Sequence, residues 1–175
     1  EFEQGMKYYK GDGVSQDYAK AADWFLKAAE QGIATAQFNL GVMYANGQGV
    51  PQDYAKAIDW YRKAAEQGDA KAQFNLGLMY AEGQGVPQND TKAAEWYQKA
   101  AKQGNAIAQF NLANMYNQGA GVPQDYAKAV DWYRKAAKRG LTAAQFGLGT
   151  MYDQGKGTPQ DYAKAVDWYR KAAER

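Results

Sequence analysis

The sequence contains neither cysteine nor histidine. Without cysteine the chain has no disulfide framework and no thiolate chemistry. Without histidine it lacks the commonest zinc ligand and the commonest general base. We therefore expect no enzyme activity, no catalytic residue, no metal site and no cofactor.

The sequence also lacks a large net charge and long apolar runs. The 21 Lys and Arg residues nearly balance the 19 Asp and Glu residues, so the net charge is only +2. A balance of this kind gives no reason to expect binding to nucleic acid or to an anionic membrane surface. No apolar run is long enough to span a bilayer, and no segment has the pattern of a signal peptide.

The sequence consists of one 36-residue unit that is repeated almost five times. The segment Ala36-Gln37-Phe38-Asn39-Leu40-Gly41 returns unchanged at 72–77 and with one change each at 108–113 and 144–149, without insertions. The prolines and tryptophans keep the same spacing, at Pro51, Pro87, Pro123 and Pro159 and at Trp24, Trp60, Trp96, Trp132 and Trp168. Such a period is typical of stacked supersecondary units. We predict a single solenoid domain over 1–175, with repeats at 1–34, 35–70, 71–106, 107–142 and 143–175. Because the chain begins partway through a repeat, it has the look of a trimmed fragment.

Each repeat is expected to contain two helices. In the repeat 35–70, the spacing of Ala36, Leu40 and Tyr44 predicts a first helix over roughly 36–46 with one buried stripe. Thr35 is its predicted cap, and the Gly-Gln-Gly-Val-Pro segment at 47–51 ends it.

A second helix is predicted from about Asp53, its cap, to Gln67, with Gly68 closing it. Asp59 and Lys63 are spaced as an i, i+4 ion pair on its solvated face, worth about 0.3 kcal/mol. The same spacing recurs at Asp23/Lys27, Glu95/Lys99, Asp131/Lys135 and Asp167/Lys171. The whole chain is therefore predicted to be all-α, an alpha-alpha superhelix (solenoid) of about five 36-residue helix-turn-helix repeats.

Three landmarks recur in order: Ala-x3-Leu-Gly-x2-Tyr, Gly-x-Gly-Val-Pro, and Asp-Tyr-x-Lys-Ala-x2-Trp-Tyr-x-Lys-Ala-Ala-x-x-Gly. In these the chain resembles the Sel-1-like repeat family, relatives of the tetratricopeptide repeats, whose period is about 34 residues. Asn89-Asp90-Thr91 departs from the Asp-Tyr-Ala of the other repeats, which predicts one lost tyrosine contact at position 90. The resemblance covers the whole chain.

The resemblance implies a non-catalytic adaptor or scaffold for protein–protein contacts. It favours a bacterial periplasmic or secreted protein, although a bacterial array and an engineered consensus fit the near-identical repeats equally well. One Helicobacter branch carries a disulfide in each repeat, and this cysteine-free chain does not match that branch.

Positions that differ between repeats are free to serve binding. Four such positions on the first helix fall within about 60° of one another on a helical wheel. First helices line the concave wall of tetratricopeptide-type superhelices, so we predict a groove there that binds a protein or extended peptide. The predicted wall residues are Thr35, Asn39, Val42, Asn46, Lys71, Asn75, Leu78, Glu82, Ile107, Asn111, Asn114 and Gln118. The amides of Asn39, Asn75 and Asn111 would pair with a peptide backbone. The alternative is that all these positions are simply tolerant of change.

Three other patterns have competing interpretations. The Gly-x-Gly loops follow a helix and lack Gly-Lys-Ser/Thr, so they are turns rather than phosphate cradles. The repeated aromatics fit packing better than binding to single-stranded nucleic acid. The basic cluster Arg134, Lys135, Lys138 and Arg139 either attracts an acidic partner or balances a helix dipole, and we favour the second.

The ends of the array suggest another role. Phe2 and Met6 at one end, and Val166, Trp168 and Tyr169 at the other, belong to ordinary repeats rather than polar capping units. Apolar surface is therefore expected at both ends, and the alternative function is an architectural spacer or an end-to-end self-associating module.

Overall fold

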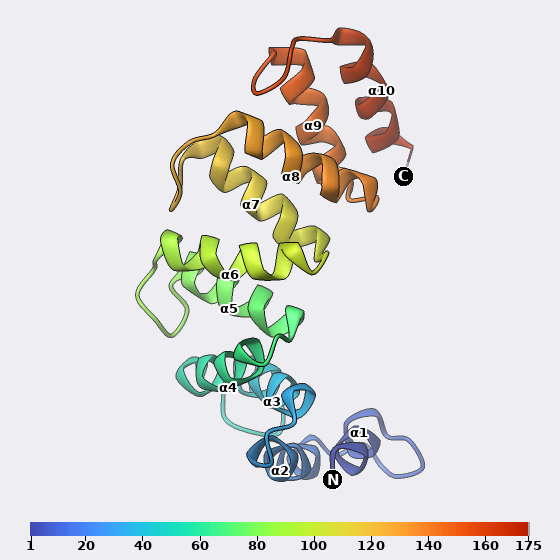
Figure 1. Cartoon of the computed structure of the whole chain (residues 1–175). Helices are drawn as coiled ribbons and strands as arrows, with labels where there is room; N and C mark the ends of the chain where they lie inside the picture. Colours follow the sequence, from blue (N-terminus) through green and yellow to red (C-terminus); the bar gives the residue numbers. More distant parts are fainter. Residues whose placement is uncertain (175) are drawn as a thin grey trace. The chain divides into compact units, whose positions relative to one another are not determined.

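The computed structural model describes residues 1–174, which form ten α-helices and no strand (Figure 1). The helices are α1 (Phe2–Lys10), α2 (Tyr18–Glu30), α3 (Ala34–Asn46), α4 (Tyr54–Glu66), α5 (Ala70–Glu82), α6 (Asp90–Lys102), α7 (Ala106–Gln118), α8 (Tyr126–Lys138), α9 (Thr142–Gln154) and α10 (Tyr162–Ala173). Odd-numbered helices are the predicted first helices and even-numbered helices the second ones. The predicted all-α fold of helix-turn-helix repeats is confirmed.

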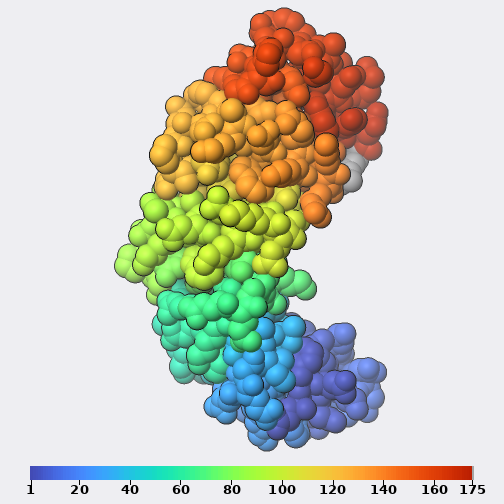
Figure 2. Space-filling view, viewed as in Figure 1, coloured from blue at the N-terminus to red at the C-terminus, as the bar shows by residue number. Residues whose placement is uncertain are grey.

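The chain divides into two compact units, Glu1–Gln88 and Asn89–Arg175. Unit 1 contains α1 to α5 and unit 2 contains α6 to α10. Inside each unit, every helix packs against the helices next to it in the chain. In the space-filling view the sequence colours accordingly run in order across each unit without mixing (Figure 2). The single domain over 1–175 and its repeat boundaries stay a prediction.

The second helices begin at a capping side chain, as predicted. Asp53 accepts a hydrogen bond from the backbone N–H of Lys56 at 3.0 Å, and Asn89 serves α6 in the same way. Each cap satisfies one of the backbone donors that a helix N-terminus leaves unpaired. The carboxylates at Asp17, Asp125 and Asp161 have lowered pKa values, mainly because they accept this backbone hydrogen bond.

The predicted cap at Thr35 is wrong. Helix α3 begins at Ala34 with Ile33 at its N-cap and no side-chain cap, so Thr35 lies inside the first turn. The capping position is two residues earlier, where α5 and α7 have Asp69 and Asn105, and both of these do cap their helices.

The Gly-x-Gly loops are places of close backbone approach. Gly47 ends α3 in the left-handed conformation at φ 67°. Gly49 follows at φ 70° and lies directly on the backbone of Tyr18, where a β-carbon would collide. The loop that joins the two helices of this repeat therefore also rests on the start of the preceding second helix, which leaves no room for a β-carbon at position 49.

The core consists of small residues facing large ones. Ala36 and Leu40 of α3 are buried, whereas Tyr44 is half-buried. Gly41 lies so close to the ring of buried Tyr61 that an added β-carbon would be 2.7 Å from it. This glycine lets α3 and α4 approach each other.

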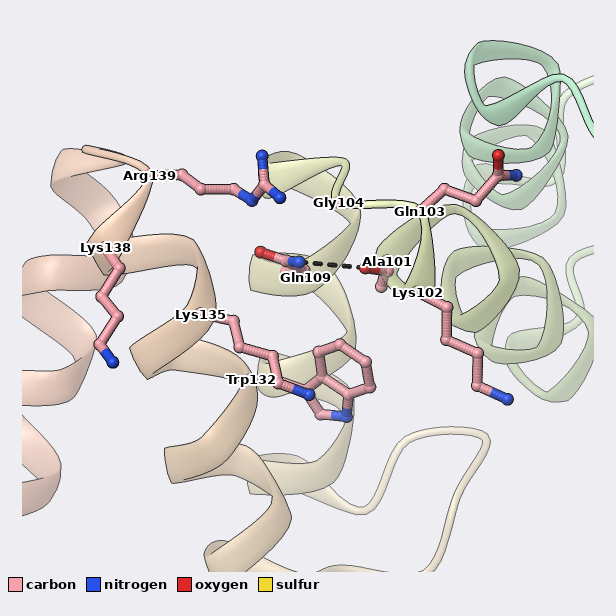
Figure 3. Close-up of a pocket in the computed structure, with 9 residues that line it drawn as sticks. All are labelled: Ala101, Lys102, Gln103, Gly104, Gln109, Trp132, Lys135, Lys138 and Arg139. Carbon is pink, nitrogen blue, oxygen red and sulfur yellow. Dashed lines mark hydrogen bonds between the residues drawn. The ribbon is translucent and has the colours of Figure 1, made fainter.

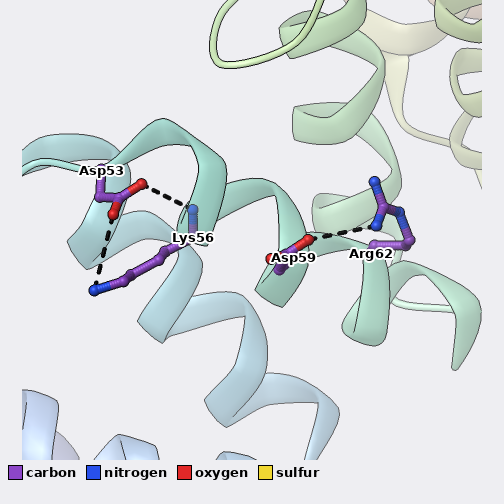
Figure 4. A network of polar contacts seen from close by, with 4 residues as sticks. All are labelled: Asp53, Lys56, Asp59 and Arg62. Carbon is purple, nitrogen blue, oxygen red and sulfur yellow. Dashed lines mark hydrogen bonds and ion pairs between the residues drawn. The ribbon is translucent and has the colours of Figure 1, made fainter.

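The charged face pairs differently from the prediction (Figure 4). Asp59 is paired with Arg62, with 3.4 Å between Oδ1 and Nη1. Lys63 instead lies over the ring of half-buried Trp60, with Nζ 4.0 Å from the centroid. The predicted i, i+4 ion pair is therefore wrong, and the same stacking recurs in the part of the chain that the structure describes at Lys27/Trp24, Lys99/Trp96, Lys135/Trp132 and Lys171/Trp168. The tryptophan one turn earlier offers the lysine both an electrostatic partner and an apolar surface for its stem.

Candidate binding surface

The variable positions of the first helices gather around surface hollows in unit 1. Thr35, Asn39 and Lys71 line a hollow of about 450 Å³, although two of them come from α3 and one from α5. Asn46, Asn75 and Leu78 line a second hollow of about 320 Å³. Residues 36 positions apart in the sequence, such as Thr35 and Lys71, thus line the same hollow.

In unit 2, Asn114 lines a hollow of about 220 Å³ with residues of α7, α8 and α9. Five predicted wall residues take no part in these three hollows: Val42, Glu82, Ile107, Asn111 and Gln118. Val42 and Asn111 are half-buried, whereas Ile107 is half-exposed, and Glu82 and Gln118 are exposed.

Two of the asparagines in the predicted amide row are engaged inside the protein. Asn39 donates from Nδ2 to the sulfur of Met6 at 3.8 Å, and the Asn75 side chain forms a hydrogen bond with the Tyr61 hydroxyl. Burial raises the pKa of Tyr61 to about 12 despite that hydrogen bond, which lowers it. Both amides are half-buried, so part of their hydrogen-bonding capacity is used in joining neighbouring helices.

The tyrosines at the equivalent positions 61 and 133 have different hydrogen-bond partners. In unit 2 the hydroxyl of Tyr133 donates to Oδ1 of Asn114 in the helix paired with its own. Gly147 occupies the position in the following helix where Asn75 faces Tyr61, and the ring of Tyr133 lies against it. A variable wall position therefore supplies an acceptor where the following helix offers none. Tyr169 makes the corresponding bond to Thr150 at 3.3 Å.

Sequence reasoning missed aromatic residues that line the same hollows. Phe38 lies in the first hollow, and Phe110 and Phe146 lie in the third. Phe146 is 60% exposed. Their constancy between repeats points to packing, but position 38 is next to the variable strip on the helical wheel, and that was the available signal. Asn117 also lines the third hollow, at a position that reads Ala45 and Ala81 in unit 1.

Among residues 1–174, no group of three or more acidic side chains is placed to hold a metal ion. Across the same residues, no helix combines the length and the apolar character needed to cross a membrane.

A known protein family matches almost the whole chain. The sequence profile of the Sel1 repeat matches at residues 5–33, 34–69, 70–105, 106–141 and 142–175. No curated protein matches the sequence. The resemblance drawn from the repeated motifs is thereby confirmed.

Several solved structures are similar. One is c5321, a protective antigen present in uropathogenic Escherichia coli strains that displays an SLR fold; it is 44% identical with a TM-score of 0.96, over 99% of this chain and 37% of that chain. A Sel1 repeat protein from Oxalobacter formigenes is 42% identical with a TM-score of 0.92, over 97% of this chain and 70% of that one. Helicobacter pylori cysteine rich protein B is 27% identical with a TM-score of 0.58, over 77% and 96% of the two chains. The present chain thus spans little more than a third of the length of the E. coli protein.

Proposed function

The chain belongs to the Sel1 repeat family, and on that premise we propose that it is a scaffold that holds an extended segment of a partner protein on the surface formed by its first helices. Sel1 repeats are generally protein–protein interaction modules, and their fold is typically non-catalytic. The proposal concerns the hollows of each unit, which we call the first-helix wall.

One observation carries the proposal. In unit 1, variable residues from α3 and α5 meet around shared hollows, although they lie 36 residues apart in the sequence, as Thr35 and Lys71 do. The hollows combine half-buried amides with aromatic and aliphatic side chains. An extended peptide presents backbone donors and acceptors at regular intervals, and its side chains alternate in direction. Amides and apolar hollows side by side match both features.

The hydroxyls near the wall are suited to hydrogen bonding rather than to proton abstraction. Burial raises the pKa of Tyr61 and Tyr133 to about 12. A general base works best with a pKa near the operating pH. Both hydroxyls therefore keep their protons at neutral pH and can donate hydrogen bonds there.

The test is selection of peptides from a displayed random library, followed by calorimetry with a selected peptide. The variant Asn39→Ala, Asn75→Ala, Asn111→Ala is expected to weaken binding at least about tenfold, because each lost amide leaves a peptide group unpaired. Tyr61→Phe is the matched control for Asn75, since it removes the same internal hydrogen bond and leaves the amide in place. A second control, Asp23→Ala with Asp131→Ala, changes only the outer charged face. Unchanged affinity in the triple variant would refute the proposal.

The alternative function, end-to-end self-association, has its own supporting observation. In unit 2 the side chains of Tyr162 and Val166 are 63% and 52% exposed, and Phe146 and Tyr169 line a hollow of about 610 Å³. Trp168 is half-buried there, and at the other end Phe2 and Met6 are half-buried too. Light scattering over a concentration series tests this alternative. A mass that rises with concentration and returns to the monomer value in Val166→Glu would support it, whereas a constant monomer would exclude it.

A further inference from the structure

A second surface of unit 2 lies where the end of α8 meets the turn between α6 and α7 (Figure 3). It is a hollow of about 570 Å³. Four cationic side chains line it: Lys102, Lys135, Lys138 and Arg139. The Arg139 guanidinium lies over Gly104, where an added β-carbon would collide with it. Because Gly104 has no side chain, the Arg139 side chain can extend over it, and Gln109 lies beside it (Figure 3).

The positive charge of this hollow is not neutralised inside the protein. Among residues 1–174, none of the four cations forms an ion pair. Lys135 covers the ring of Trp132 at 4.0 Å from the centroid. A group of like charges around a concave surface attracts an oppositely charged ligand.

A buried polar atom also faces the hollow. Gln109 is only 4% exposed, and its Nε2 donates to the backbone oxygen of Ala101 at 3.0 Å. Its Oε1 has no hydrogen-bond partner among the described residues 1–174 and points away from Ala101, toward the side of the hollow where Arg139 lies (Figure 3). Buried acceptors without a partner are unfavourable and rare, so this oxygen marks a place for a donor.

Unit 1 contains the same place with different chemistry. The counterparts of the four cations, 72 residues earlier, are Glu30, Lys63, Glu66 and Gln67. Their summed charge is −1, against +4 in unit 2. Gln67 donates from Nε2 to Oε1 of Gln37 at 2.8 Å, so the acceptor that is open at Gln109 is satisfied there. The equivalent place is thus slightly acidic with its glutamine acceptor paired in unit 1, and strongly basic with that acceptor unpaired in unit 2.

We infer that the hollow beside Arg139 binds an acidic segment of a partner protein. A carboxylate of the segment pairs with Arg139 and Lys138, and a neighbouring backbone N–H donates to Oε1 of Gln109. A fully ionised oxyanion offers only acceptors, so it would repel that oxygen. A peptide offers both a carboxylate and a donor. The inference concerns a surface separate from the first-helix wall and stands whether or not that wall binds a peptide.

The test uses the whole chain and a C-amidated peptide, Gly-Asp-Glu-Asp-Gly, that carries fluorescein on its N-terminus, followed by fluorescence anisotropy at low salt. The amide peptide Gly-Asn-Gln-Asn-Gly is the control for charge. A peptide with N-methylated backbone amides is the control for the donor, and its affinity is expected to fall about tenfold because the Gln109 oxygen stays unpaired. Inorganic sulfate, which is fully ionised, is the control for a simple anion site and should not displace the peptide at equal concentration.

The variant Lys102→Glu, Lys138→Glu, Arg139→Gln gives these three positions of unit 2 the residues that unit 1 has at the equivalent positions. All three side chains are exposed, so the fold should survive, which circular dichroism checks. Peptide affinity is expected to fall at least about tenfold. The reciprocal variant Glu30→Lys, Glu66→Lys, Gln67→Arg should raise the stoichiometry from one peptide to two. Unchanged binding in the first variant, equal binding of the amide peptide, or displacement by sulfate would each overturn the inference.

Discussion

Gln67, at the end of α4, donates a hydrogen bond from Nε2 to Oε1 of Gln37 in α3, over 2.8 Å. Gln37 is buried, and its own Nε2 donates to the backbone oxygen of Ala29 at 3.1 Å. Ala29 belongs to the last turn of α2, whose final carbonyls have no partner within the helix. One buried amide therefore links three consecutive helices.

Replacing that amide should destabilise unit 1 measurably. Gln37→Ala is expected to lower the free energy of unfolding by about 2 kcal/mol, because it removes two hydrogen bonds together with the buried side chain that makes them. Gln109→Ala removes only the bond to Ala101, since Oε1 of Gln109 has no partner, and should cost about 1 kcal/mol. Urea unfolding monitored by circular dichroism compares the two, with the exposed Gln154→Ala as control. Equal losses at 37 and 109 would contradict the role assigned to Gln67.

The stacking of Lys63 on Trp60 should be detectable in a double-mutant cycle. We expect a coupling energy of about 0.5–1 kcal/mol between these two side chains, as for an exposed cation–π contact. The cycle between Asp59 and Lys63 should give a coupling near zero, because Asp59 is paired with Arg62. Lys171 and Trp168, at 4.2 Å, provide a second copy for replication. A sizeable coupling between Asp59 and Lys63 would restore the ion pair that the spacing alone predicted.

Most of the fold could be predicted because its signals are local. Apolar spacing located the helices, Asp53 located a cap, and glycine located the helix ends. The predicted ion pair between Asp59 and Lys63 failed because spacing alone does not choose between two cationic neighbours. The i, i+3 and i, i+4 neighbours of Asp59 are both cationic, and the ring of Trp60 decided between them.

The candidate surface could be predicted in outline only. Comparison of the repeats found Asn39 and Lys71, which line one hollow. It did not reveal that Asn75 is bonded to Tyr61, because that contact joins helices through tertiary packing. The basic hollow was visible only as a cluster of charges. In unit 1 Gln67 donates to Oε1 of Gln37 over 2.8 Å, whereas the residue equivalent to Gln67 in unit 2 is Arg139 and Oε1 of Gln109 stays unpaired. The sequence shows the change from Gln to Arg but not the hydrogen bond that is lost with it.

Two loop glycines make a matched pair for testing the close approach of the loops. Gly13 and Gly49 both have positive φ, 72° and 70°. A β-carbon at Gly13 meets nothing within 4 Å, whereas one at Gly49 collides with the backbone of Tyr18. Gly13→Ala should therefore cost only the backbone strain, about 1 kcal/mol, and Gly49→Ala should cost about 3 kcal/mol or partly unfold unit 1. Thermal unfolding and amide exchange in α2 measure the difference. Similar costs at both positions would show that the loop yields rather than clashes.

The buried tyrosines predict a loss of stability at high pH. Burial raises the pKa of Tyr61 and Tyr133 from 10.0 to about 12. Below pH 10 each hydroxyl keeps its proton in the folded and the unfolded chain, so stability is unaffected. As the pH rises from 10 through 12, the unfolded chain releases these protons first, and each tyrosine should then lower the free energy of unfolding by about 1–3 kcal/mol.

Urea unfolding at a series of pH values from 8 to about 11.5 measures this fall, and Phe variants identify its source. Phe25 occupies the same position in the first repeat and is fully buried, so Tyr61→Phe and Tyr133→Phe should fold. Each is expected to flatten the decline above pH 10, whereas Tyr162→Phe, at a side chain that is 63% exposed, should not. Lysines titrate in the same range, but they are unchanged in all three variants and cancel in the comparison. An equally steep decline in Tyr61→Phe and in the parent chain would mean that the Tyr61 hydroxyl ionises in the folded state as readily as in the unfolded one.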